Sequence, residues 1–151
     1  MKQGKELRRA VSTAATIGTL LAIAACSQSQ PEALPETRAG LGCVDDSKQC
    51  IDQRQATLKS MMADNDRKWV REGATSQAYA SGVRLFAFKN RKKDLSCDEL
   101  AIGKREADAG PGVLRGSGGG GLTPAQVSRG VMLAGEVGKE LGVEMKRRCR
   151  A

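Results

Sequence analysis

Two short segments of this 151-residue chain have the local pattern of a helix start. Ser96 stands three residues before Glu99, and Thr123 stands three residues before Gln126, with Pro124 between them. In such a capping box the Ser or Thr side chain accepts from the backbone N–H three residues on, and the Glu or Gln side chain accepts from the cap's own N–H. Proline suits the first helical position because its missing N–H needs no partner there. We therefore expect helices to begin directly after Ser96 and Thr123.

The chain from residue 43 onward has apolar residues at helical spacing in four segments. Gly73 and Gly82 weaken the second segment by ~1 kcal/mol each, and a break near Gly73 is an alternative that we keep open. The third segment should stop before Pro111, which cannot continue a helix without losing a hydrogen bond. The expected helices span about 46–62, 67–91, 97–108 and 124–148.

The composition favours close-packed helices over a β-sandwich. Aromatic residues make up 3% of the chain, so the core must come from Leu, Val, Met and Ala. The last predicted helix also carries a stripe of small residues at every fourth position: Gly130, Ala134, Gly138 and Gly142. We expect this stripe to admit the alanine-rich second helix closely. The predicted fold class is all-α, a small helical bundle of about four helices that run up and down alternately.

The first 25 residues have the form of a secretory signal. Lys2, Lys5, Arg8 and Arg9 make a positive start, and a short apolar run follows that is too brief to span a bilayer. The run ends at Ile23-Ala24-Ala25-Cys26, which resembles the lipobox of bacterial lipoproteins. The resemblance implies removal of residues 1–25, attachment of lipid (palmitate among the acyl chains) to Cys26, and a mature protein anchored to a membrane.

The residue after the lipid-bearing cysteine bears on location. An aspartate there favours the inner membrane in enteric lipoproteins, whereas this chain has Ser27, so the outer membrane is favoured. The proline-containing, polar residues 26–42 are predicted to be a flexible tether. Residues 43–151 are then the helical domain.

Four cysteines remain after Cys26 is set aside: Cys43, Cys50, Cys97 and Cys149. An even set in an oxidising compartment predicts two disulfides; the alternative is four free thiols in a reducing cytosol. In an up-and-down bundle all four would meet at one pole. We favour Cys43–Cys149 with Cys50–Cys97, and Cys43–Cys97 with Cys50–Cys149 is nearly as good. A Cys43–Cys50 bridge would contradict the arrangement, since two helical residues seven apart lie ~10 Å from each other.

Basic side chains gather at the same predicted pole. They close the second and fourth helices: Lys89, Arg91, Lys92, Lys93, Lys146, Arg147, Arg148 and Arg150. One hypothesis is that this basic pole contacts anionic lipid head groups or an anionic cell-wall polymer, where each cation adds ~1 kcal/mol. The alternative is that these cations complement the helix dipoles.

Several kinds of chemistry lack the residues that they need. The chain has no histidine, which excludes catalytic triads and His–metal sites, and no CxxC motif. The acidic pairs 45–46 and 98–99 stand at helix starts, where capping explains them. Residues 116–121 satisfy GxGxxG, but no strand precedes them, so a linker is favoured over a phosphate loop. We expect no cofactor, no metal and no catalytic residue.

Charge and export together limit the partners. Residues 1–25 hold four basic residues and one acidic residue, so the mature chain keeps 21 basic and 16 acidic residues, a net charge of +5. This is too little for a dedicated nucleic-acid binder. The sequence predicts a non-catalytic envelope lipoprotein that faces the periplasm, with a structural or adaptor role and a protein partner that it does not identify. The alternative is a periplasmic inhibitor or immunity-type protein that binds a toxin or hydrolase.

Overall fold

The computed structural model describes residues 36–116 and 120–149, and these residues form helices with no strand. In chain order the elements are α1 (Glu36–Ala39), α2 (Lys48–Ala63), the 3-10 helix η1 (Lys68–Arg71), α3 (Ser76–Ser81), α4 (Val83–Arg91), α5 (Cys97–Arg115) and α6 (Pro124–Arg148). Two disulfides cross-link them. The expected fold class, a small all-α bundle stapled by disulfides, is confirmed.

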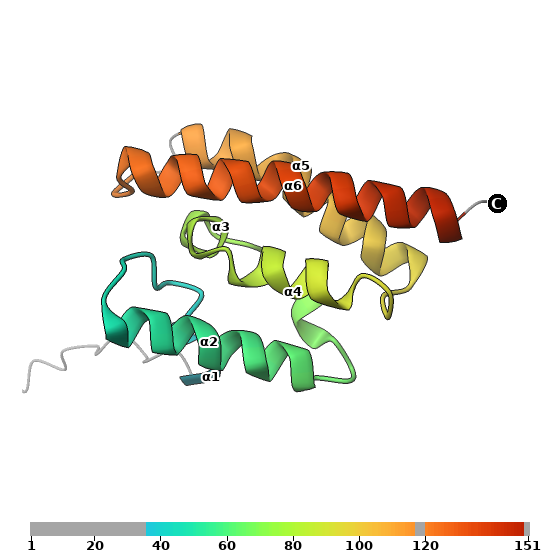
Figure 1. The fold of residues 1–151 in the computed structure, drawn as a ribbon, viewed down its shortest axis with the longest axis horizontal. Helices are drawn as coiled ribbons and strands as arrows, with labels where there is room; N and C mark the ends of the chain where they lie inside the picture. The colour runs from blue at the N-terminus through green and yellow to red at the C-terminus, as the bar shows by residue number, and fades with distance from the viewer. Residues whose placement is uncertain (1–35, 117–119, 150–151) are drawn as a thin grey trace, which may run out of the picture. The chain divides into compact units, whose positions relative to one another are not determined.

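The short helices α3 and α4 lie between α2 on one side and the crossed pair α5 and α6 on the other (Figure 1). This middle layer supplies the centre of the core, where Leu85 and Phe88 are completely buried. The Trp69 ring meets Phe88 edge-on with 4.8 Å between ring centroids, a favoured aromatic geometry. Most of the remaining core is aliphatic, as the composition predicted.

Both capping boxes are present at the predicted positions. The Ser96 and Thr123 side chains accept from the N–H groups of Glu99 and Gln126, and both return bonds are made. Leu95, just before the first cap, is completely buried, which fixes how the chain enters α5. The bounds of α6 are those predicted.

The segment expected as one helix over 67–91 is broken twice. The break near Gly73 occurs, between η1 and α3, where Thr75 caps the new helix. The second break is at Gly82, which has a φ of +74° and joins α3 to α4. A Cβ at Gly82 would lie 2.6 Å from Cδ2 of Leu133, so both the backbone conformation and the close packing require glycine.

Because of these breaks, α4 runs in the same direction as α2 and not opposite to it. Nη1 of Arg91, at the end of α4, donates to the carbonyl of Met62, at the end of α2. Nη1 of Arg148, at the end of α6, donates to the carbonyl of Lys92, the residue after α4. Helices α2, α4 and α6 therefore all end at one pole of the bundle, and the alternating up-and-down arrangement that we expected is wrong. The stretch through η1 returns the chain so that α2 and α4 run the same way.

The expected disulfide pairing is wrong for the same reason. Cys43 bonds to Cys50, with 5.2 Å between Cα atoms, and Cys97 bonds to Cys149, with 5.7 Å. Cys43 lies outside α2, so the distance argument for two helical residues did not apply to it. Because α2 starts at the pole opposite to the end of α6, the four cysteines do not meet. The first bridge closes the N-terminal loop on α2, and the second ties the start of α5 to the end of α6.

Helix α5 is longer than predicted, because it continues through Pro111 to Arg115. A proline inside a helix loses one backbone bond, at a cost of ~3 kcal/mol. Packing beyond it offsets this loss: Gly110 is buried against Ala134 and Tyr79, and Leu114 is 2% exposed. Tertiary burial therefore decides the end of α5.

The small-residue stripe of α6 packs mainly against α5, not against the second predicted helix as we expected. A Cβ at Gly138 would meet Asp108 and Ala107 of α5, and one at Gly142 would meet Lys104. Among the glycines of the stripe, Gly130 approaches the segment 67–91, since the carbonyl of Tyr79 would lie 3.2 Å from its added Cβ. The expected function of the stripe, close helix contact, is right, but the main partner differs.

Part of the predicted tether belongs to the folded unit. Helix α1 contacts α2, and the N–H of buried Gly40 donates to Oγ1 of Thr57 at 3.1 Å. A Cβ at Gly40 would lie 2.4 Å from the Gln53 carbonyl oxygen. Residues 26–35 of the predicted tether, like the signal segment and Cys26, lie outside the described residues.

Close packing of α5 against α4 leads to the first testable prediction. A Cβ at Gly103 would lie 2.5 Å from Cδ1 of Phe88, so we expect Gly103→Ala to lower the free energy of unfolding by about 1–3 kcal/mol. Gly112→Ala in the same helix is the control: nothing lies within 4 Å of its Cβ position, and we expect a gain of up to about 1 kcal/mol. Urea denaturation measures both; equal effects would contradict the packing.

Candidate functional site

The structure brings the two halves of the predicted basic pole together. Arg148 Nη1 donates to the carbonyls of Lys92 and Lys93, at 3.1 and 2.8 Å, and Nη2 donates to that of Leu95. The end of α6 therefore lies against the turn that follows α4. The Cys97–Cys149 disulfide holds the same two segments covalently. Arg150 lies outside the described residues.

Two arginines of this pole bind backbone carbonyls at helix ends. Arg91 is 9% exposed; its Nη1 donates to the Met62 carbonyl at 2.6 Å and its Nε to Asp94. Arg148 does the same for the turn after α4. The last carbonyls of a helix have no partner within it and carry partial negative charge. The dipole-complementing interpretation of the basic pole therefore accounts for these two residues.

Three more cations of the pole are held by carboxylates of α6. Lys89 pairs with Glu136 and Glu140, Lys92 pairs with Glu140, and Arg147 pairs with Glu144. Hydrogen bonds from Lys92 and Lys89 hold the pKa of Glu140 below its ordinary value. Five of the eight predicted cations are thus engaged by carbonyls or carboxylates of the fold.

Of the acidic residues that we expected at helix starts, Glu99 takes part in capping α5, whereas Ser47 caps α2. Asp45 accepts from the Ser47 N–H at 2.8 Å. Asp46 pairs with Arg129 at 2.9 Å and joins the starts of α2 and α6. Glu99 accepts from both the Ser96 N–H and Arg67 Nε. These contacts engage the three carboxylates in fixing the starts of helices.

Glu99 leads to a prediction about pH. Burial acts to raise the pKa of Glu99, but the Ser96 N–H and Arg67 outweigh it and hold that pKa below its ordinary 4.5. A depressed folded-state pKa stabilises the protein above the unfolded-state pKa, and this stability is lost as pH falls through the folded-state value. We expect the urea midpoint to fall below pH ~4.5 and Glu99→Gln to flatten that fall. If the urea midpoint of Glu99→Gln fell with pH as steeply as that of the wild type, the stabilising role of ionised Glu99 would be contradicted.

A buried ion pair lies at the centre of the bundle and was not anticipated from the sequence. Arg84 is 1% exposed, and its Nε and Nη2 donate to the two carboxylate oxygens of Glu106 at 2.8 and 2.6 Å. Its remaining donors reach the carbonyls of Trp69 and Glu72 at 2.6 and 2.8 Å. Burial first, and Glu106 second, raise the pKa of neighbouring Tyr79. Arg84 thus fastens the end of η1 to α4 and α5.

A groove between α3, α4 and α6 exposes apolar side chains. Phe86 is 43% exposed and Met132 is 75% exposed, and both line this hollow of about 390 Å³ with Leu133. Its charged lining residues are Arg54, Arg129 and Glu136. Sequence reasoning missed the groove because Phe86 and Met132 come from helices whose contact only the tertiary fold establishes.

The described residues contain neither a metal-binding cluster nor a membrane-spanning helix. No group of three or more His, Cys, Asp or Glu side chains is arranged to hold a metal ion. None of the described helices combines the length and apolar character needed to cross a bilayer. No protein-family model, curated protein or solved structure matches this chain.

Proposed function

We propose that the protein is a non-catalytic lipoprotein of the bacterial cell envelope, anchored through Cys26 and facing the periplasm, most favourably on the outer membrane. The observation that carries this proposal is the pairing of the cysteines. Cys43 with Cys50 and Cys97 with Cys149 use four of the five, and Cys26 is the one left for acylation. Disulfides of this kind persist in oxidising compartments such as the periplasm.

The described residues support a structural or adaptor role rather than catalysis. Their buried charges are engaged with one another or with helix ends: Arg84 with Glu106, Arg67 with Glu99, and Glu144 with Arg147. No buried side-chain polar atom among the described residues lacks a hydrogen-bond partner.

Mass spectrometry of the protein from a Gram-negative host tests the anchor. We expect the chain to start at Cys26 with the added mass of acyl chains, to hold two disulfides and to sediment with membranes. In the matched control, Cys26→Ala, we expect the protein to keep both disulfides but to lose the acyl mass. A native chain with Met1 intact, no acyl groups and five reduced thiols would overturn the proposal.

The alternative function, a periplasmic inhibitor or immunity-type protein, is favoured by the apolar groove. Phe86 and Met132 expose apolar surface beside the guanidinium groups of Arg54 and Arg129. The groove suits a segment of a partner protein that presents apolar side chains. A toxin or hydrolase that carries such a segment would be its target.

A direct binding assay separates the alternative from the adaptor role. Phe86→Ser with Met132→Ser should abolish a one-to-one complex that inhibits a secreted hydrolase or toxin. Val143→Ser is the matched control, because Val143 is 67% exposed but does not line the groove. Retained inhibition in the double variant, or its loss in the control, would rule out this use of the groove.

A further inference from the structure

One face of α6 carries two large apolar side chains that the described part of the fold leaves uncovered. Met132 is 75% exposed and Val143 is 67% exposed. Their separation in the sequence corresponds to about three helical turns, so both side chains lie on the same face, ~16 Å apart along the helix axis. Of the three large hydrophobic residues that the described residues expose, two therefore share this face, and the third is Phe86 of α4.

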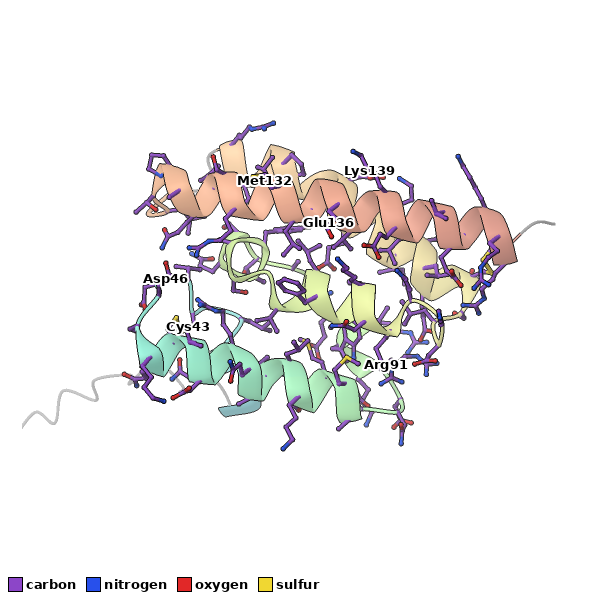
Figure 2. All side chains as sticks on the ribbon, viewed as in Figure 1. Cys43, Asp46, Arg91, Met132, Glu136 and Lys139 are labelled. Carbon is purple, nitrogen blue, oxygen red and sulfur yellow. A yellow bond between two sulfur atoms is a disulfide. The ribbon has the colours of Figure 1, made fainter. Side chains whose placement is uncertain are left out.

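Two residues of opposite charge lie between these apolar side chains. Figure 2 shows Met132, Glu136 and Lys139 in succession along α6, with Glu136 on the flank that faces α4 and Lys139 on the opposite flank. Lys139 is exposed, and none of the hydrogen bonds or ion pairs among the described residues involves it. Glu136 pairs with Lys89, yet its side chain remains 56% exposed. The face therefore offers both an ammonium group and an accessible carboxylate to a partner.

The order of these four residues along α6 makes the face complementary to itself. Met132 and Val143 are equally distant from a point between residues 137 and 138, and so are Glu136 and Lys139. A second α6 that lies antiparallel across this point therefore meets Met132 with Val143 and Glu136 with Lys139. Each contact occurs twice, as a two-fold axis requires. A Cβ at Gly135 would meet nothing within 4 Å, so side chains of the second helix have room there.

Two other occupants fit this face less well. A parallel pair of α6 helices would place Lys139 against its own copy, and like charges in contact repel each other. An anionic bilayer would attract Lys139 but repel Glu136. To insert Met132 and Val143, the bilayer would also have to desolvate the carboxylate that lies between them, which is costly.

We propose that the protein forms a two-fold symmetric dimer through the outer faces of two antiparallel α6 helices. Met132 of each chain packs against Val143 of the other, and Glu136 of each chain pairs with Lys139 of the other. A contact between two single helices buries less than the ~1,200 Å² of a standard interface, so the dimer is weak and its partners exchange. The dimer does not require the lipid anchor.

Sedimentation equilibrium of the full, oxidised chain tests the dimer. Every sample carries Cys26→Ala, so that neither acyl chains nor a Cys26 disulfide can join two molecules. We expect a monomer–dimer equilibrium that Lys139→Glu weakens at least tenfold, because it opposes like charges at both contacts. Lys59→Glu is the matched control, since Lys59 is exposed on α2, and should change the affinity less than twofold. A wild type that stays monomeric up to ~1 mM, or equal losses in the two variants, would overturn the proposal.

Mixing two variants tests the charge pairing itself. We expect Glu136→Lys alone to weaken the dimer as Lys139→Glu does, whereas an equimolar mixture of the two variants should associate as tightly as the wild type. In the mixed dimer, opposite charges meet again at both contacts. Lys89 keeps its pair with Glu140 at 3.1 Å, so circular dichroism should show an unchanged helical fold in Glu136→Lys. A mixture that associates no better than its components would overturn the proposal.

A photoreactive side chain tests the direction of the two helices. We expect p-benzoylphenylalanine at position 132 to form a covalent bond to a peptide of a second chain that contains Val143, which mass spectrometry identifies. Phe86→Ser alters the neighbouring groove but not α6, and should leave this cross-link unchanged. A cross-link between the two copies of position 132, or no cross-link between chains, would overturn the antiparallel dimer.

Discussion

Replacing Arg84 with methionine is expected to lower the free energy of unfolding by about 3–5 kcal/mol, the usual effect of breaking one side of a buried ion pair. The substitution leaves the Glu106 carboxylate buried without its guanidinium and removes the donors that Trp69 and Glu72 use. Methionine keeps much of the side-chain volume, so a cavity contributes little to the loss. Urea denaturation at pH 7 measures the effect.

Two further variants show whether the buried charge is the cause. Arg71→Met changes an exposed arginine and should alter stability by less than about 0.5 kcal/mol. Arg84→Met with Glu106→Met removes both charges and should recover part of the loss, because no lone carboxylate remains. The recovery should be incomplete, since two carbonyls still lack their donors. A double variant that is less stable than Arg84→Met would contradict this explanation.

Removing the Cys97–Cys149 disulfide by alanine substitution is expected to cost about 4 kcal/mol. The two cysteines are 52 residues apart, and a cross-link that closes a long loop removes much entropy from the unfolded chain. The Cys43–Cys50 bridge closes a loop over a separation of only 7, so its removal should cost about 2 kcal/mol on the same basis. The difference between the two double variants is therefore the informative quantity.

Denaturant unfolding of the two alanine pairs under non-reducing conditions measures this difference. The comparison requires that each variant unfolds in a single transition, which coincident fluorescence and circular dichroism curves establish. A greater loss from the Cys43–Cys50 pair than from the Cys97–Cys149 pair would contradict the loop-length argument. It would indicate instead that the fold depends more on the contact of the N-terminal loop with α2.

The basic pole illustrates how a correct observation from sequence can have a different physical meaning in the fold. The cations do converge where α4 and α6 end, as predicted. Three helices rather than two end there, and Arg91 and Arg148 bind the carbonyls of neighbouring chain segments. The convergence of negative helix ends explains why this pole needs so many cations.

The sequence by itself determined the features that depend on a few neighbouring residues. Ser96 and Thr123 start helices because each capping box is complete within four residues, and the scarcity of aromatic and abundance of small residues favoured an all-α core. The presence of two disulfides also followed from the number of cysteines. None of these features requires knowledge of which helix lies beside which.

Only the tertiary structure decided the direction of the helices and everything that follows from it. The left-handed conformation of Gly82 and the return stretch through η1 make α2, α4 and α6 end together, and this places Cys97 beside Cys149 and far from Cys43. Burial of Leu114 carries α5 through Pro111 against its local preference. The physical reason is that packing of distant segments contributes several kcal/mol at such positions, which exceeds the local preferences that a sequence pattern records.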